Sequence, residues 1–312
     1  MIRKEFTRKR YRDKLIAISL AILVLGSSCL GCSKKSDVER RRQSENETFD
    51  ETETTDYLYD EPESLGRSMT YADGSLIFHH MHVDEAAIPI EYDLDKFIKV
   101  DGKMTYEDEK YTYKLGVDVS KYQEKVKWDK VEKEGYEFAM IRLGYRGYTE
   151  GEIFLDEKYE YNIKAANRSG LDVGVYFFSQ AITEDEAIEE ANFVLEHVKD
   201  QELGMPIVYD PEIVYNDKSR TKGISKEQFT KNTLAFCNTI ADAGYEVMIY
   251  ANMLWEDQQL NMSEIMKYDI WYADYVGLPQ TPYHFSMWQY TDKGTVDGIK
   301  GGADINIQLI EK

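Results

Sequence analysis

The chain has 312 residues, of which 42% are hydrophobic, and a net charge of −20 at pH 7. This length allows one large domain or two of ordinary size, with enough apolar residues for a real core. The acidic balance argues against nucleic acid as a partner, because binding to phosphates requires a basic surface.

Residues 1–32 have the pattern of an export signal. Seven Lys or Arg and two acids give residues 1–31 a net charge of +5, and the apolar run Leu15–Leu25 follows. Small residues then lead to Cys29 and Cys32, in an order that resembles a bacterial lipobox. Cys32 directly follows a Leu-Gly pair and is the better match, so we expect lipidation there. The alternative is an uncleaved membrane anchor, and both place the remaining chain at the outer face of the cytoplasmic membrane.

Residues 33–64 are rich in Ser, Glu, Asp, Thr and Arg. Such a segment cannot bury enough apolar area to offset its chain entropy, so we predict a flexible acidic tether. Residues 65–113 are predicted to form a small β-rich extension. Within it, Phe97–Tyr106 is typical of a hairpin that turns at Asp101-Gly102.

The histidines near residue 80 do not predict a metal site. His80 and His82 would share one strand face, but no nearby cysteine or second histidine cluster completes a site, so neither metal nor cofactor is expected. Outside the export signal the only cysteine is Cys237, which we expect to be buried and inert. Without a disulfide, the core must stabilise the domain.

From residue 114 to residue 312 the sequence predicts one larger domain in which helices and strands alternate. Helices are expected over 125–134, 157–169, 183–199 and 225–243, and several end at a glycine, which readily adopts the left-handed conformation of a helix end. The alternation predicts a parallel α/β fold, either a barrel or a doubly wound sheet. No glycine-rich phosphate loop follows the first strand, which disfavours a nucleotide-binding sheet.

Polar and aromatic residues recur where the predicted strands end. In an α/β barrel the chemistry lies at the C-terminal ends of the strands. The residues at these ends are Asp118, Tyr176, Asp210, Glu212 and Tyr250. We expect them at one edge of the sheet, as an active-site rim requires, although strand ends are often polar in any protein.

Asp210 and Glu212 point to acid–base chemistry. Two residues apart on a strand, their side chains lie on one side, roughly 6.5–7 Å apart along the chain. Pro211 offers no ladder donor, so the strand is expected to end there. Close carboxylates repel, and one keeps its proton to higher pH. A protonated acid beside an ionised one is suited to acetal cleavage. The alternative is a solvated strand end with two surface acids.

Seven short motifs in order resemble glycoside hydrolase family 25, the muramidases often called lysozymes. The similarity covers about residues 115–308. It implies an irregular parallel β/α barrel with about five helices, whose last strands are joined by short connections. The motifs are Gly116–Gln123, Phe138–Tyr145, Gly174–Ser179, Pro206–Glu212, Trp271–Tyr275, Trp288–Tyr290 and Ala303–Asn306.

The resemblance implies hydrolysis of the β-1,4 bond from N-acetylmuramic acid to N-acetylglucosamine in peptidoglycan. Glu212 matches the general acid, and Asp210 matches the partner that assists the substrate N-acetyl group. Asp118 and Asp304 match the other two acids of the site. The family's groove has aromatic residues at positions matched by Tyr176, Tyr250, Tyr275 and Trp288. For each of these four, core packing is an equal alternative.

The family favours retention of configuration with the substrate's own N-acetyl group as nucleophile, but strand spacing alone does not separate retention from inversion. Two other functions remain open. One is a catalytically weak barrel that binds glycan in a cell-wall remodelling assembly, which the presence of all four acids disfavours. The other is a barrel glycosidase that acts on host or dietary glycans.

Overall fold

The computed structural model describes residues 66–312. The predicted export signal (1–32), with Cys29 and Cys32, and the predicted tether (33–64) lie outside the described residues and stay predictions. Within residues 66–312, no helix has the length and apolar character needed to cross a membrane.

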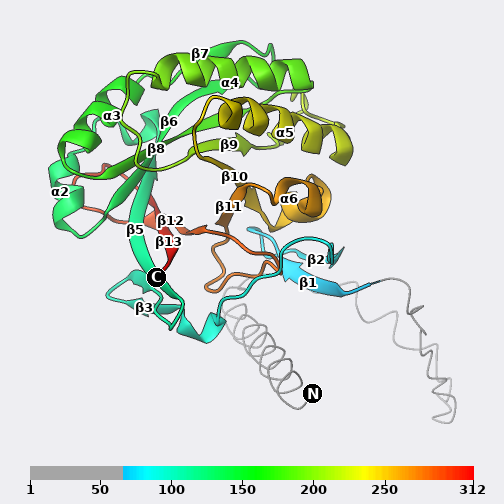
Figure 1. Ribbon diagram of the computed structural model, residues 1–312, viewed down its shortest axis with the longest axis horizontal. Coiled ribbons are helices and arrows are strands. Elements are labelled where there is room, and N and C mark those ends of the chain that lie inside the picture. The colour runs from blue at the N-terminus through cyan, green and yellow to red at the C-terminus, as the bar shows by residue number, and fades with distance from the viewer. Residues whose placement is uncertain (1–65) are drawn as a thin grey trace, which may run out of the picture. The chain divides into compact units, whose positions relative to one another are not determined.

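Eight strands close into a barrel (Figure 1). Neighbouring strands run parallel from the first to the seventh, which confirms the predicted α/β barrel. The eighth strand runs antiparallel to both of its neighbours and closes the barrel. In chain order they are β5 (Tyr111–Val119), β6 (Phe138–Arg146), β8 (Asp172–Ser179), β9 (Ile207–Pro211), β10 (Val247–Asn252), β11 (Asp269–Ala273), β12 (Met287–Gly294) and β13 (Ala303–Glu311). A short strand, β7 (Ile153–Leu155), pairs with β6 outside the barrel.

Helices cover only part of the barrel. Four of them lie within the predicted ranges: α2 (Trp128–Lys133), α3 (Tyr159–Arg168), α4 (Glu184–Val198) and α5 (Lys226–Asp242). Two short helices, α6 (Met253–Gln258) and α7 (Met262–Ile265), follow β10. In Figure 1 the longer helices arch over the green and yellow strands. The connections from β11 to β12 and from β12 to β13 contain no helix, as predicted for the last strands.

The N-terminal extension covers the side that lacks helices. It contains the hairpin β1 (Ser68–Ala72) and β2 (Phe78–His82), the 3₁₀ turn η1 (Leu94–Lys96), and the hairpin β3 (Ile98–Val100) and β4 (Lys103–Thr105). Asp101 and Gly102 have φ of 49° and 84°, which confirms the predicted turn. The Tyr92 hydroxyl donates to the carbonyl oxygen of Phe285 at 2.5 Å. The ring of Phe97 also contacts Trp288, so the extension covers the outer face of β12.

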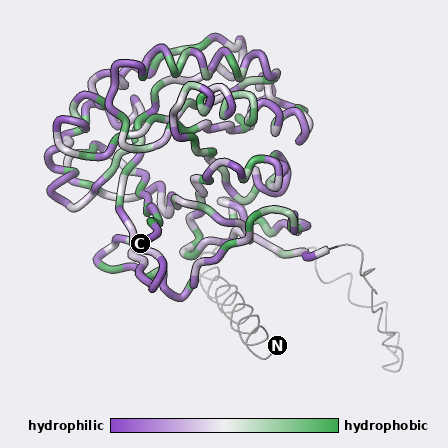
Figure 2. The backbone as a smooth tube through the Cα atoms, in the orientation of Figure 1, coloured by the Kyte–Doolittle hydropathy of each residue, from purple (hydrophilic) through white to green (hydrophobic). Residues whose placement is uncertain are grey.

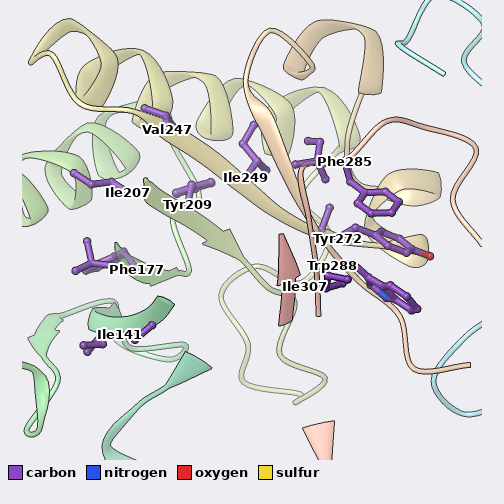
Figure 3. Close-up of a cluster of buried hydrophobic side chains, with 14 of the residues drawn as sticks. Ile141, Phe177, Ile207, Tyr209, Val247, Ile249, Tyr272, Phe285, Trp288 and Ile307 are labelled. Atoms are coloured by element: carbon purple, nitrogen blue, oxygen red, sulfur yellow. The ribbon is translucent and has the colours of Figure 1, made fainter. Parts of the chain in front are cut away.

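Side chains alternate between two apolar layers along each strand. The outer layer lies between the strands and the helices and extension that cover them. Figure 3 labels ten of its residues, from Ile141 to Ile307. The inner layer fills the barrel and includes Met140, Val208, Met248, Trp271 and Met287. Hydrophobic stretches accordingly follow the strands, while hydrophilic and hydrophobic stretches alternate along the covering helices (Figure 2). Alternate residues of each strand point into the barrel. The last of these inward-pointing residues on a strand therefore faces the barrel mouth.

Candidate functional site

Three acidic residues meet at the barrel mouth because each lies at the relevant strand end. Asp118 is the penultimate residue of β5, and Asp304 lies opposite it at the start of the antiparallel β13. Asp210 is the penultimate residue of β9, which ends at Pro211 as predicted. A fourth acid, Glu212, is the first residue after β9. Asp118 and Asp210 are 4% and 5% exposed, so their carboxyl groups are almost fully removed from water.

Asp118 is held by two amide side chains. Its Oδ2 accepts hydrogen bonds from Gln289 Nε2 at 2.7 Å and from Asn306 Nδ2 at 2.9 Å. Asn306 is oriented in turn by Trp271, whose Nε1 donates to Asn306 Oδ1 at 2.8 Å. Sequence reasoning did not single out these three partners, although all of them lie in the seven motifs. The amide side chains could have been found as the polar residues of otherwise apolar strands.

Three tyrosines lie around this network. Tyr250 and Tyr275 donate their hydroxyl hydrogens to Gln289 Oε1 at 3.1 and 2.6 Å. The Tyr176 and Tyr250 rings contact the Trp271 ring edge to face, with centroids 5.9 and 5.1 Å away. Tyr176 and Tyr250 are half-buried, whereas Tyr275 is 43% exposed. The structure thus places the three predicted tyrosines beside the acids.

Burial raises the pKa values of Asp118 and Asp304 to different extents. Burial raises the pKa of Asp118 to about 6, against the lowering effect of its hydrogen bonds from Asn306 and Gln289. Burial and the nearby charge of Asp118 raise the pKa of Asp304 to about 9. Asp304 therefore carries the proton and Asp118 is mostly ionised, because like charges this close do not both ionise easily.

The pKa values of Asp210 and Glu212 are also raised. Burial, with a smaller contribution from Asp118, raises the pKa of Glu212 to about 7. Burial, followed by the charges of Glu212 and Asp118, holds the pKa of Asp210 well above its ordinary value. Asp210 Oδ1 is buried and accepts no hydrogen bond from any of residues 66–312. The pair therefore retains protons at neutral pH and offers one carboxyl oxygen for a ligand.

Glu212 is positioned through its backbone. Gln180 Nε2 donates to the carbonyl oxygen of Glu212, and the carbonyl oxygen of Gln180 accepts from Arg220 Nη1 at 3.1 Å. Arg220 forms a bidentate ion pair with Glu186 on α4, with distances of 2.6 and 2.9 Å. The loop after β9 is thereby attached to α4. No spacing in the sequence indicates these partners, since they come together only in the fold.

Trp288 does not line an open groove, although its match to the family implied one. It is packed in the core, which was the equal alternative. It is fully buried in the outer layer, and its Nε1 donates to the carbonyl oxygen of Asp274 at 2.9 Å. Its ring contacts Phe97 of the extension edge to face, with centroids 5.3 Å apart. Its neighbours Met287 and Gln289 have the parity that faces the barrel interior, so Trp288 must face outward.

His80 and His82, two of the three histidines on β2, are not part of a metal site in the described residues. The rings of His80 and His82 are 5.9 Å apart on one face of the strand. Across residues 66–312, no group of three or more His, Cys, Asp or Glu is arranged to hold a metal ion. Cys237 is fully buried, and burial raises the pKa of its thiol, as expected for an inert cysteine.

The chain resembles known proteins over the barrel. The family model described as glycosyl hydrolases family 25 matches residues 117–299. The autolytic lysozyme of Clostridium acetobutylicum is 27% identical over 192 residues, which cover 61% of this chain and 54% of that protein. The chain therefore spans about half the length of this curated relative.

Two solved structures share the fold. The modular autolysin LytC from Streptococcus pneumoniae has a TM-score of 0.59 at 24% identity, covering 78% of this chain and 56% of that chain. A family 25 glycosyl hydrolase from Bacillus anthracis has a TM-score of 0.54 at 23% identity, covering 65% and 92% of the two chains.

Proposed function

The chain belongs to glycoside hydrolase family 25, and we propose that it hydrolyses the β-1,4 bond between N-acetylmuramic acid and N-acetylglucosamine in peptidoglycan. The observation that carries this proposal is the pair Asp210 and Glu212, whose pKa values are both raised at a mouth that also holds Asp118. The similarity to an autolytic lysozyme supports the choice of substrate.

Glu212 is assigned as the general acid. A carboxyl group with a pKa of about 7 is partly protonated at neutral pH and transfers that proton readily to the leaving glycosidic oxygen. In the free chain Asp210 holds its proton more tightly than Glu212, so the reactive state requires the proton to lie on Glu212 instead. A bound N-acetyl group favours this arrangement, because its N–H donates to an ionised Asp210. The free Oδ1 of Asp210 accepts this hydrogen bond.

The N-acetyl carbonyl oxygen forms a bond to the anomeric carbon as the glycosidic C–O bond breaks. The Glu212 carboxylate then takes a proton from water, whose oxygen replaces the N-acetyl oxygen. Asp118, held ionised by Gln289 and Asn306, stabilises the positive charge that develops on the sugar.

Product analysis tests the assignment. A chain of residues 66–312 and its Glu212→Gln variant are incubated with purified peptidoglycan, and the products are reduced with borohydride and identified by mass spectrometry. We expect fragments with reduced N-acetylmuramic acid ends, formed about 10²–10⁴-fold more slowly by the variant. Proton NMR of the products before reduction should show the β-anomer first, because reduction removes the anomeric centre. An initial α-product rules out the N-acetyl mechanism.

If a folded chain, verified by circular dichroism, yields no fragments but sediments with the polymer, the catalytically weak glycan-binding barrel is the correct function. If it cleaves only other glycans, the substrate assignment is wrong.

We further propose that the enzyme acts outside the cytoplasm, attached by a lipid at Cys32. The support is the order of basic residues, apolar run and cysteine in the first 32 residues. Labelling with a fatty-acid analogue should mark the full chain and its Cys29→Ser variant, but not a Cys32→Ser variant. Unlabelled protein that stays in the membrane fraction indicates an uncleaved anchor instead.

A further inference from the structure

A lysine-lined pocket of about 490 Å³ opens in a chain that is otherwise strongly acidic. Its walls come from the segments that follow β5 and β7 and from the connection between β12 and β13. The pocket follows the C-terminal ends of β5 and β12, the strands that carry Asp118 and its partner Gln289, so it lies on the same face as the barrel mouth. Its lysines are Lys125, Lys127, Lys130, Lys158 and Lys300.

Asp156 connects the pocket wall to the strands at the barrel mouth through hydrogen bonds. This buried carboxylate accepts hydrogen bonds from the backbone N–H of Lys121 at 3.0 Å and of Lys158 at 2.8 Å. It also accepts one from Arg142 Nε at 2.8 Å. Lys121 follows Asp118 by three residues, and Arg142 lies near enough to lower the pKa of Asp210. One side chain thus joins the pocket wall to the strands that carry the acids.

The pocket walls are held in place by buried contacts. Asn162 is fully buried, and its Nδ2 donates to the carbonyl oxygen of Glu124 at 3.1 Å, while its Oδ1 accepts from Trp128 Nε1 at 3.3 Å. On the other side, the backbone N–H of Lys127 donates to the carbonyl oxygen of Gly298 at 2.9 Å. Gly298 has φ of 100°, and an added Cβ would lie 2.5 Å from the Lys127 carbonyl oxygen.

Two of the lysines are neutralised within the pocket. Lys130 Nζ lies 2.9 Å from an oxygen of Asp297, and Lys300 Nζ lies 3.0 Å from an oxygen of Glu124. These are exposed pairs that stabilise the fold little. They leave the other three lysines to account for the charge of the pocket.

Lys125, Lys127 and Lys158 form no ion pair with any of residues 66–312. The ammonium group of Lys125 lies over the ring of Tyr161, 5.0 Å from its centroid. The hydrogen bond from Lys130 and the charge of Lys127 both lower the pKa of Asp297. The pocket lining still has five lysines against two acids, although acids outnumber Lys and Arg by 58 to 38 in the whole chain. Ammonium groups are point-charge donors suited to anionic oxygens.

We propose that this lysine pocket binds carboxylates on the peptide substituents of the glycan strand whose sugar bond lies at Glu212. The assignment rests on the proposed function, because it takes the ligand to be part of the same polymer. A concave site of this volume fits a discrete anionic group better than a flat lipid surface. Its place beside the mouth suits a substituent on a strand that extends away from the reacting bond.

Sedimentation with insoluble polymer tests the pocket separately from cleavage. Residues 66–312 carry Glu212→Gln throughout, so the strands stay intact. The test variant is Lys125→Gln/Lys127→Gln/Lys158→Gln, and the control is Lys99→Gln/Lys199→Gln/Lys231→Gln, which removes the same charge elsewhere. We expect the test variant to bind peptidoglycan about 10-fold more weakly, as loss of three partly exposed charge contacts predicts. The control should bind like the parent.

Glycan strands freed of their peptides supply the decisive comparison. On these strands we expect the test variant and the parent to bind equally. Gly298→Ala displaces the wall without changing charge, and should weaken binding to peptidoglycan but not to the peptide-free strands. An equal loss on both polymers, or no loss on either, overturns the assignment.

Inorganic phosphate and a soluble stem peptide are also compared as competitors at equal concentration. If phosphate competes as well as the peptide, the pocket is a phosphate site and the assignment is overturned. If the test variant loses binding only to anionic lipid vesicles, the pocket is a lipid site and the assignment is overturned as well. Failure of the wild-type chain to cleave, with the binding difference intact, rejects the proposed function alone.

Discussion

Gln289 makes hydrogen bonds with three polar side chains at the barrel mouth. It donates to Asp118 and accepts from Tyr250 and Tyr275. Its donated bond lowers the pKa of a buried carboxylate whose pKa burial raises. A single amide thus keeps an acid ionised and also fixes two aromatic side chains in position. Gln289 is a positioning residue, because it acts through Asp118.

We expect Gln289→Ala to lower kcat/KM about 10–100-fold, since both electrostatic and positional effects are lost. Without the donated hydrogen bond the pKa of Asp118 rises, so the acidic limb of the pH profile of kcat/KM should move to higher pH. Gln308→Ala is the matched control, because Gln308 lies on β13 four residues beyond Asp304 and away from the mouth. An unchanged acidic limb in Gln289→Ala contradicts this role.

The buried acids make the folded state less stable as pH rises. Glu212 has a pKa of about 7 in the folded chain and an ordinary, lower value when unfolded, so the folded state binds more protons between these values. We expect Glu212→Gln to raise the Tm above that of the wild type at pH 8 and to leave it nearly unchanged at pH 4.5.

Each kcal/mol gained at pH 8 corresponds to about 2–4 °C in a domain of this size. Glu196→Gln is the control with the opposite sign, because Lys199 lowers the pKa of Glu196. Thermal melts at both pH values measure the difference. An equal gain for Glu212→Gln at pH 4.5 and pH 8 argues against a titrating origin.

The extension takes the place of the helices that the last strands lack. Phe97 of the extension is 6% exposed, and its ring contacts the rings of Trp288 and Tyr106. Tyr272 and Phe285 stack beside this contact, with centroids 5.6 Å apart, and Figure 3 shows them next to Trp288. Aromatic pairs of this kind stabilise beyond the area that they bury.

We expect Phe97→Ala to lower the free energy of unfolding by about 3–5 kcal/mol, because it leaves a cavity against Trp288. Phe78→Ala provides the control, since Phe78 on β2 is 63% exposed. Urea unfolding followed by tryptophan fluorescence measures both. A loss below about 1 kcal/mol for Phe97→Ala indicates that the extension contributes little to stability.

The sequence predicts the helices well because local signals mark their ends. Each of the four helices that the sequence predicts begins and ends within three residues of its expected bounds. Thr183 and Ser225 cap two of them, and Gly135, Gly170 and Gly244 follow three of them with positive φ. These signals require no knowledge of the tertiary fold.

The direction of Trp288 was not predictable in this way. Both faces of β12 are buried, one by the barrel interior and one by the extension. Hydrophobicity therefore does not show which alternate residues of the strand point inward and which point outward. The antiparallel direction of β13 could have been predicted from the length of the connection before it. The connection from Gly294 to Ala303 is shorter than the dozen residues that a parallel crossover needs. Gln180 and Arg220 act through contacts that no local pattern encodes.

The whole molecule depends on the extension for a closed surface. A chain that begins at residue 111 keeps all eight barrel strands but exposes the aromatic face around Trp288 and Phe285. We expect this truncated chain to aggregate and to bind a hydrophobic dye, because large exposed apolar patches associate. Residues 66–312 serve as the control in light scattering and dye fluorescence. A monomeric truncated chain with an unchanged Tm refutes this dependence.

The antiparallel course of β13 brings the chain end back to where the barrel began. Glu311 pairs with Tyr111, and the backbone N–H of Lys312 donates to the carbonyl oxygen of Lys110 at 2.9 Å. Asp304, at the other end of the same strand, lies at the mouth. A peptide tag fused after Lys312 and captured on a bead or sensor chip will therefore hold the protein by its rear, with the mouth turned toward polymer supplied in solution.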